Sequence, residues 1–442
     1  MHRDSCECST EGLALNQVPQ TMSVLDKATW EEIYPVSSID NRNPTAPIEF
    51  DIKGQGEHYM DLSQTYLFVR FKVTKSDHAD LGDDTQTTPV NNFLHSMFSD
   101  VDVILNDKLI TPGTDTYPYR AYLEKLLSYS PSTSKKQIRS SCMWVKDQAG
   151  KMNAVNPYVA DKADAGYNEG LVQRGKMVKE SREVSTMDRL HLDMFQQTKY
   201  LINGVDLRLK FHRARTPFCL MGNADGAISI TSMVLYVRKV RPMPGVLNRI
   251  NQMLNTATAK YPLRRVEVKS FTIPAGTRSK ITDNVFAGQL PKRVFIGFVE
   301  NAGYNGALDK NPFKFDHCDV SKVEVTLNGE MQTSRPFEPK FGAEKQYLRS
   351  YMSLFQTLGR IGDDWSPDIT YEEYGDGFTL WGHDFTTDQN AHKDQFHLIK
   401  TGNMRIELQF NTALAHTINC IVYGEFDNVL EINKAREVTV DY

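Results

Sequence analysis

The chain has 442 residues, of which 40% are hydrophobic and 24% charged, and its formal net charge is −4. This length suits two or three globular domains, and the composition is that of an ordinary globular protein, so disorder is not the default expectation. The near balance of 51 basic and 55 acidic residues gives no reason to expect binding to nucleic acid through bulk positive charge.

The sequence has no feature typical of an exported or membrane-spanning protein. No stretch reaches the ~18 consecutive apolar residues of a membrane helix, and the N-terminus lacks the apolar core of a signal peptide. Six cysteines are scattered without the spacing of a disulfide framework: Cys6, Cys8, Cys142, Cys219, Cys318 and Cys420. We therefore expect no transmembrane segment, and reduced thiols in the cytosol or nucleus.

Residues 1–45 are polar and interrupted by prolines, with one possible short turn near Trp30. They are expected to form an N-terminal arm and not a domain. Strands are predicted at residues 47–52 and 66–73, and a polar loop at 75–89 follows them.

The clearest signal in the first half lies between residues 99 and 129. Apolar side chains occupy alternate positions in SDVDVILN, which is the period of a strand with one buried face. Asn106 and Asp107 then turn the chain into a hairpin. A helix is predicted next, with Thr116 as its cap and an apolar stripe at helical spacing formed by Tyr119, Tyr122, Leu123, Leu126 and Leu127.

A long excursion rich in Gly, Asn, Asp and Lys follows at about residues 149–185, and we expect it to be an outer loop. Strands are predicted to resume at 190–195, 201–211 and 228–240. The sequence Pro242-Met243-Pro244-Gly245 breaks this pattern, and a helix is predicted at 246–259. This is the natural linker between two halves.

The second half repeats the signals of the first in the same order. The stretch SKVEVTLNGE has the same alternation, and its Asn328-Gly329 pair is the strongest short hairpin signal, because both central residues of a type I′ turn need positive φ. A second helix is predicted with the stripe Leu348, Tyr351, Met352, Phe355 and Leu358. Two further pairs of segments match, LFVRF (67–71) with VFIGF (294–298) and VDLRLKF (205–211) with MRIELQF (404–410).

Four matching pairs in one order indicate that a whole β domain has been duplicated. We predict an all-β protein of two tandem eight-stranded antiparallel jelly rolls, with short helices in the inter-strand loops. Strands and helices do not alternate along the sequence, so a parallel sheet is not expected. The expected boundaries are an arm at 1–45, a first roll at 46–243 with its outer loop at about 149–185, a linker helix at 244–263, a second roll at 264–432 and a C-terminal tail at 433–442.

Motifs that could carry chemistry are weak. The stretch GLVQRGK at residues 170–176 matches most of a phosphate-binding loop, but no strand precedes it and Met177 replaces the required hydroxyl. Cys6 and Cys8 lack the further ligands that zinc needs. The run Asp316-His317-Cys318-Asp319 is better explained as a turn than as a ligand cluster, since adjacent strand residues point to opposite faces.

Other candidates depend on an unknown fold. His383, Asp384, His392, His397 and His416 would bind a metal only if the fold brought them together. No G-x-S-x-G or H-E-x-x-H motif occurs, and a carboxylate pair for glycoside chemistry cannot be recognised from spacing. We therefore name no catalytic, cofactor-binding or metal-binding residue, and we expect neither a cofactor nor enzymatic activity.

Several long stretches resemble one family, the major capsid proteins of Polinton/Maverick elements and related adintovirus-like viruses. The similarity covers nearly the whole chain except residues 9–16 and 149–185. The stretches that carry it are NNFLHSMFSDVDVILN (91–106), TYPYRAYLEKLLSYS (116–130), AKYPLRRVEVKSFTIPAG (259–276), GQLPKRVFIGFV (288–299), RSYMSLF (349–355) and HLIKTGNMRIELQF (397–410), with SCEC (5–8) and the closing Asp441-Tyr442.

This resemblance implies a double jelly-roll capsid protein. Three chains would form a homotrimer with a nearly hexagonal outline, and such trimers would tile an icosahedral shell around double-stranded DNA without reading its sequence. A single jelly-roll penton protein would occupy the vertices, and the chain would reside in the virion after assembly in the host nucleus or cytoplasm. The main alternative is a β-sandwich that is carbohydrate-active or lectin-like, and a second is a cellular scaffold of two β domains.

Overall fold

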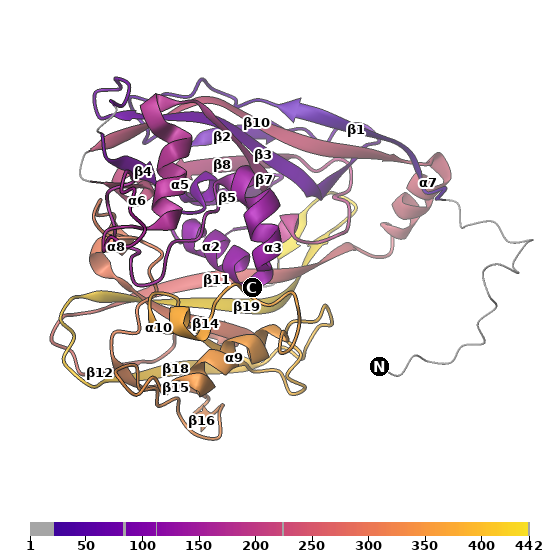
Figure 1. The fold of residues 1–442 in the computed structure, drawn as a ribbon. Coiled ribbons are helices and arrows are strands. Elements are labelled where there is room, and N and C mark those ends of the chain that lie inside the picture. The colour runs from indigo at the N-terminus through magenta and orange to yellow at the C-terminus, as the bar shows by residue number, and fades with distance from the viewer. Residues whose placement is uncertain (1–21, 83–84, 112, 223–224, 441–442) are drawn as a thin grey trace, which may run out of the picture.

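The computed structural model describes residues 22–82, 85–111, 113–222 and 225–440, and its two halves lie one above the other (Figure 1). The N-terminal half contains two four-stranded sheets, and β4 (Thr87–Pro89) pairs with β9 (Leu220–Gly222) beside them. In spatial order, one sheet contains β1 (Leu25–Ile33), β10 (Gly226–Pro242), β3 (Tyr59–Lys75) and β7 (Val184–Arg189). The other contains β2 (Ile48–Ile52), β8 (Leu207–Arg213), β5 (Phe98–Leu105) and β6 (Lys108–Leu109).

The C-terminal half contains two sheets built in the same way. One has the order β11 (Ala259–Ile273), β19 (Ile418–Ile432), β14 (Arg293–Glu300) and β17 (Trp381–Asp384), and β20 (Val438–Val440) pairs with β19. The other has the order β12 (Ser279–Thr282), β18 (Thr401–Phe410), β15 (Val320–Leu327) and β16 (Glu330–Met331), and β13 (Ala287–Gln289) pairs with β18.

The two halves have the same topology. If the eight path strands of each half are numbered along the chain, the first sheet reads 1-8-3-6 and the second 2-7-4-5 in both halves. Every pairing among these strands is antiparallel, and two packed sheets of this kind form a jelly roll. The all-β double jelly roll predicted from the sequence is therefore confirmed.

The two hairpins that suggested the repeat occupy equivalent places. Asn106 and Asp107 have φ of 44° and 64°, and Asn328 and Gly329 have φ of 52° and 84°. Both pairs thus adopt the positive φ of a tight hairpin turn between β5 and β6 or between β15 and β16. The predicted turns are confirmed.

The alternating residues of these strands line the cores. Buried side chains in β5 and β8 include Val101, Val103, Leu105, Leu207, Leu209 and Phe211. Their counterparts in β15 and β18 are Val323, Val325, Leu327, Ile406, Leu408 and Phe410. Each roll therefore closes over its own apolar face, as the period of two predicted.

Short helices lie in the loops between strands. They are α1 (Phe93–Ser96), α2 (Tyr117–Ser128), α3 (Pro131–Thr133), α4 (Arg139–Cys142), α5 (Glu169–Val178), α6 (Thr216–Cys219), α7 (Pro244–Met253), α8 (Asn301–Asn305), α9 (Leu348–Leu358) and α10 (Tyr371–Gly375), with the short segments η2 (Ser134–Ile138), η3 (Lys179–Ser181) and η4 (Asp193–Phe195). Among the described residues, no helix is long and apolar enough to cross a bilayer.

The helix α9 forms where predicted, but only part of its predicted stripe is buried: Phe355 and Leu358 lie in the core, whereas Leu348 does not. Its buried side includes the small residues Ser350, Ser353 and Thr357, while Leu348 is 59% exposed. The cause is close packing on β17, where a Cβ on Gly382 would lie 2.7 Å from Thr357 Oγ1. Small side chains let the helix approach the sheet, so the packing face combines these residues with Phe355 and Leu358 of the predicted stripe.

Some expected boundaries differ from the structure. Residues 25–33 form β1 although they were expected in the arm, because the strand is held by backbone pairing to β10 and little of it is buried. Residues 190–195 are not a strand: β7 ends at Arg189, and Asp193–Phe195 form the short helical segment η4. The linker helix α7 ends at Met253, and β11 begins at Ala259, within the expected linker. The expected tail contains β20.

The expected outer loop at 149–185 is also more ordered than the sequence indicated. It contains α5, whose Asn168 side chain accepts from the Gly170 N–H at the helix start. Arg174 and Asp147 form an ion pair at 2.7 Å in which both side chains are fully buried. Asp147 also accepts from Asn311 Nδ2 at 3.0 Å, which ties this region to the second roll. A buried ion pair of this kind needs its extra hydrogen bonds.

Candidate functional site

Most of the motifs noted in the sequence are structural. The segment 170–176 lies in α5, and a Cβ on Gly170 would come within 2.6 Å of the Lys146 carbonyl oxygen. That glycine therefore permits close packing and does not form a phosphate-binding loop. Cys6 and Cys8 lie outside the described residues.

The run 316–319 forms the predicted turn. Cys318 and Asp319 have φ of 49° and 50°. The Cys318 N–H donates to Asp316 Oδ1, and the Asp319 N–H donates to His317 Nδ1. These side chains are occupied by their own backbone, as in an Asx turn.

The histidines of the second roll do not gather into a ligand cluster within the described part of the chain. His397 Nε2 lies 3.2 Å from Asp388 Oδ1, and His383 is buried in β17. The His383 ring instead packs against Phe337, with centroids 5.2 Å apart.

The buried state of His383 predicts sensitivity to acid. Burial and the Arg349 charge lower the pKa of His383 from 6.5 to about 4. The unfolded chain therefore takes up this proton at a higher pH, so the stability contribution is complete above pH 6.5 and is lost as the pH falls through about 4. We expect His383→Phe to reduce the slope of unfolding free energy against pH by about 1.4 kcal/mol per pH unit in this window.

Urea denaturation at a series of pH values measures this slope. His416→Phe is the control, because His416 lies in an exposed loop of the same roll and should leave the slope unchanged. An unchanged slope in the His383 variant would contradict the assignment.

The interface between the rolls is organised around α2. This helix lies between the first roll and β11 in Figure 1, and almost all of its residues are buried. Tyr122 stacks on Phe313 of the second roll, with ring centroids 4.3 Å apart and planes at 1°. Tyr119 stacks on Tyr304 at 5.5 Å. Aromatic stacking thus joins α2 to the second roll.

Polar groups cross the same interface. Arg120 on α2 pairs with Asp193 at 2.7 Å, and Asp193 Oδ1 accepts from the Val266 N–H of β11 at 3.1 Å. The Tyr261 hydroxyl accepts from the Ile202 N–H at 3.0 Å. The two rolls therefore share buried charge and hydrogen bonds as well as apolar contacts.

A cavity of about 460 Å³ opens beside this interface and is lined by both rolls. Its acidic side chains are all paired. Glu124 contacts Arg120 at 2.9 Å, Asp188 contacts Lys125, and Glu425 contacts Arg293 at 2.8 Å. Burial alone would raise the pKa of Glu124, but Arg120 and His191 lower it to about 2.

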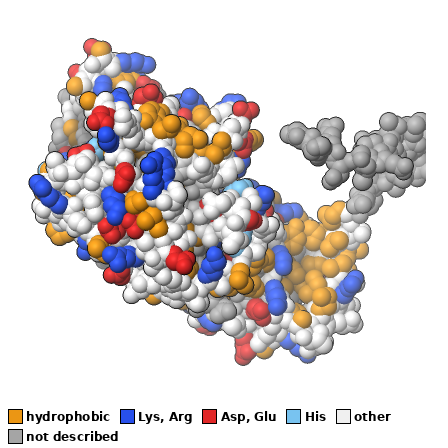
Figure 2. All heavy atoms as spheres, turned by 90° about the horizontal axis from the view of Figure 1, so that it is seen from below, with side chains coloured by type: hydrophobic (Ala, Val, Ile, Leu, Met, Phe, Trp, Pro, Cys, Tyr) orange, Lys and Arg blue, Asp and Glu red, His pale blue; other side chains and the backbone are white. Residues whose placement is uncertain are grey.

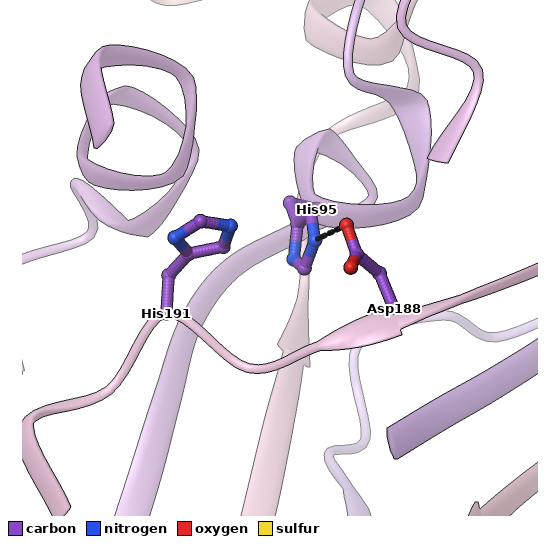
Figure 3. Close-up of side chains that lie close together, drawn as sticks. All are labelled: His95, Asp188 and His191. Atoms are coloured by element: carbon purple, nitrogen blue, oxygen red, sulfur yellow. Dashed lines mark hydrogen bonds and ion pairs between the residues drawn. The ribbon is translucent and has the colours of Figure 1, made fainter. Parts of the chain in front are cut away.

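Next to the cavity, His95, Asp188 and His191 bring one ligand atom each within 4.8 Å of one another (Figure 3). His95 comes from α1, Asp188 from the end of β7 and His191 from the segment after it. His95 Nε2 lies 3.4 Å from Asp188 Oδ2. Burial lowers the pKa of His95 to about 3, so its imidazole is neutral. This cluster was missed in the sequence because His95 and Asp188 are 93 positions apart.

The helix α9 of the second roll lacks, at its start, the cover that α2 of the first roll receives from the second roll. In the repeat, Tyr119 matches Leu348. Tyr119 is 2% exposed under aromatic rings of the second roll, whereas Leu348 is 59% exposed. Ile361 and Trp365, just beyond α9, are also exposed. An apolar surface on the second roll therefore lacks the cover that its counterpart has.

A further apolar surface lies at the end of the molecule that carries α7. Figure 2 shows hydrophobic side chains gathered there. The Met243 N–H donates to the Val24 carbonyl at 3.0 Å, which places the start of the described chain against this helix. Met22, Val24, Met243 and Met253 are all exposed. Exposed apolar surfaces of this kind commonly mark interaction sites.

Comparisons with known proteins identify the fold. No protein-family model matches the chain. It is 23% identical over 443 residues to uncharacterized protein F54H12.2 of Caenorhabditis elegans, an alignment that covers 96% of this chain and 99% of that protein.

Solved structures of viral capsids are similar in fold. A chain of the Sputnik virophage gives a TM-score of 0.64 at 11% identity, covering 99% of this chain and 93% of that chain. The Faustovirus major capsid protein gives 0.59 at 8% identity, covering 95% and 93%. The mavirus major capsid protein gives 0.55 at 12% identity, covering 100% and 96%.

Proposed function

We propose that this chain is the major capsid protein of an icosahedral virus or virus-like element. The observation that carries the proposal is the duplicated roll, in which both halves have one strand order and together resemble viral major capsid proteins over nearly their whole length. Its role is structural, and it resides in the virion.

The working unit of this proposal is a homotrimer with six rolls. Within one chain, the first roll meets the second across α2. The matching surface of the second roll, around Leu348, is exposed and would meet the first roll of the next chain. This contact is heterologous, and three such contacts close a ring. A duplicated roll thereby gives a three-chain ring a pseudo-hexameric outline that can tile a shell.

The interface within one chain supports this scheme. It combines stacked aromatic rings with buried ion pairs. An equivalent interface between two chains would therefore be both apolar and specific. A stable interface buries more than ~1,000 Å². The exposed apolar side chains at Leu348, Ile361 and Trp365 would form its centre.

We further propose the Polinton/Maverick lineage, including adintovirus-like viruses, as the origin of the chain. The stretches quoted above carry this resemblance, and the similarity to a nematode protein supports an animal setting. In this scheme a single jelly-roll penton protein fills the vertices, the shell encloses double-stranded DNA, and assembly takes place in the host nucleus or cytoplasm.

The domain division follows from the same proposal. The boundary between the rolls lies in the segment 244–263, and the first and second rolls correspond to residues 46–243 and 264–432, extended in the second roll by the start of β11 at Ala259 and by β20. The strand β1, which precedes residue 46, belongs to the first roll. The segment 149–185 lies on the outer surface of the shell and the N-terminal arm on its inner face.

We propose no enzymatic activity, no cofactor and no catalytic residue. A carbohydrate-active β-sandwich would need a cleft with carboxylates available for acid and base chemistry. In the cavity beside the interface, Glu124, Asp188 and Glu425 are each held by a basic partner. This pairing is typical of a structural network.

Leu348→Asp tests the proposed contact between chains. The side chain is exposed in the single chain, so the variant should fold. In the trimer it would bury an unpaired charge, so we expect a change from trimer to monomer by sedimentation velocity at micromolar concentration. Ile281→Asp is the matched control, because Ile281 is exposed on β12, and it should remain trimeric. Trimers in the Leu348 variant would contradict this interface.

A further inference from the structure

The cluster of His95, Asp188 and His191 has a feature that the proposed capsid role does not use. Each histidine has its Nδ1 held by a neighbour. His95 Nδ1 lies 2.9 Å from the Tyr117 hydroxyl, and His191 Nδ1 lies 2.5 Å from Glu124 Oε2. The Nε2 atom of His95 contacts Asp188 Oδ2 at 3.4 Å, and among the described residues no hydrogen-bond partner is held by both rings.

We propose that His95, Asp188 and His191 form a binding site for a borderline divalent transition-metal ion such as Zn²⁺. Two imidazole nitrogens and one carboxylate oxygen are ligands that this class of ion accepts, and the three ligand atoms lie within 4.8 Å of one another. The His95 and His191 rings stand nearly perpendicular, with centroids 4.6 Å apart.

The surroundings resemble the outer shell of a metal site. A metal-bound histidine usually donates its other N–H to a carboxylate or another oxygen, which fixes the tautomer and the ring orientation. Glu124 plays that part for His191, and the Tyr117 hydroxyl does so for His95. Arg120 holds Glu124 in turn, at 2.9 Å. Both rings are therefore oriented before any ion arrives.

The cavity gives the ion a route and a place for further ligands. Asp188 and His191 line it, while His95 lies behind them and is fully buried. Three protein ligands leave at least one coordination position, and this position would face the cavity and be filled by water.

Lys125 is the main competitor for Asp188. Its ammonium group contacts Asp188 Oδ2, the oxygen that also contacts His95 Nε2. The ion would replace the hydrogen bond between His95 and Asp188, and its charge would be opposed by Lys125. The affinity should therefore rise when the Lys125 charge is removed.

The ion would connect three separate segments of the first roll. It would join α1 to the end of β7 and to the segment that leads into η4, next to the Arg120–Asp193 pair at the interface between rolls. Metal binding would therefore stabilise the part of the first roll that contacts the second roll.

The test uses the full chain stripped of metal and then dialysed against micromolar Zn²⁺ or Co²⁺. We expect one ion per chain by elemental analysis, visible d–d absorption bands with Co²⁺, and a higher melting temperature that is reversed by chelation. His95→Gln and His191→Gln should each weaken Zn²⁺ binding by at least about 100-fold, and Tyr117→Phe by about 10-fold. Lys125→Met should strengthen it.

The control is His212→Gln, which alters an exposed histidine paired with Asp102 and should leave Zn²⁺ binding unchanged. If the buried His95 variant fails to fold, the His191 variant decides the outcome, because His191 borders the cavity. Equal Zn²⁺ retention by wild type and the His191 variant would overturn the proposal, and so would the absence of retained ion in the wild type.

Discussion

Val101→Asp and Val325→Asp, made separately, are each expected to abolish soluble protein. Both side chains are 1% exposed, and each points into the core of its own roll from an equivalent strand. An unpaired carboxylate there costs several kcal/mol or more, against a total stability of about 5–15 kcal/mol for a typical domain. Soluble expression and circular dichroism measure the result.

The matched controls lie on the same strands but on the opposite face. Ile104→Asp in β5 and Thr326→Asp in β15 alter partly exposed positions and should yield folded protein. A folded, assembling Val325→Asp variant would contradict the duplication at the level of packing, since the second roll would then not depend on the position that matches Val101.

Asp147→Leu is expected to lower the unfolding free energy by about 3–5 kcal/mol. It leaves the Arg174 guanidinium, which is fully buried, without its charged partner, and it also removes one of the two acceptors of Asn311 Nδ2. Denaturant unfolding of the purified variant measures the loss.

The double variant Asp147→Leu with Arg174→Met separates charge from packing. Apolar side chains of similar volume often replace a buried ion pair with little loss, so the double variant should be more stable than Asp147→Leu alone. A double variant that is less stable than Asp147→Leu would show that the ion pair is not what the single change removes.

The strand pattern of the rolls could be predicted because the register of each hairpin is determined by residues that are close together in the sequence. Asn328-Gly329 specifies the turn through backbone conformation, and the alternation around Val323 and Val325 specifies the buried face. Matching such segments at two places in the chain was enough to predict the double roll, since both signals depend on neighbours in sequence.

The parts that could not be predicted depend on partners distant in sequence. Residues 25–33 contain little alternating apolar character, and only pairing with β10 makes them a strand. The apolar stripe of α9 gave Phe355 and Leu358 of its packing face but not Ser353 and Thr357, which are buried because the helix lies close to Gly382. Arg174 lies in the segment that was rejected as a phosphate-binding loop, and its buried pairing with Asp147 across 27 positions is not visible in the sequence.

The histidine cluster escaped sequence analysis for the same reason. No motif spacing connects α1 to the end of β7, and the two meet only because the roll places β7 beside β3 and lays α1 against it. Its orienting partners, Tyr117 and Glu124, lie on α2. The spacing of Tyr117 and Glu124 on this helix does not by itself point to a histidine cluster.

The most direct measurement of the central claim is the mass and shape of the purified full chain in solution. The account predicts a particle of three times the 50.3 kDa chain mass by sedimentation, and hexagonal outlines with threefold symmetry by electron microscopy, together with shells or arrays at higher concentration. A strictly monomeric species at micromolar concentration, with isolated two-lobed particles in the images, would contradict it.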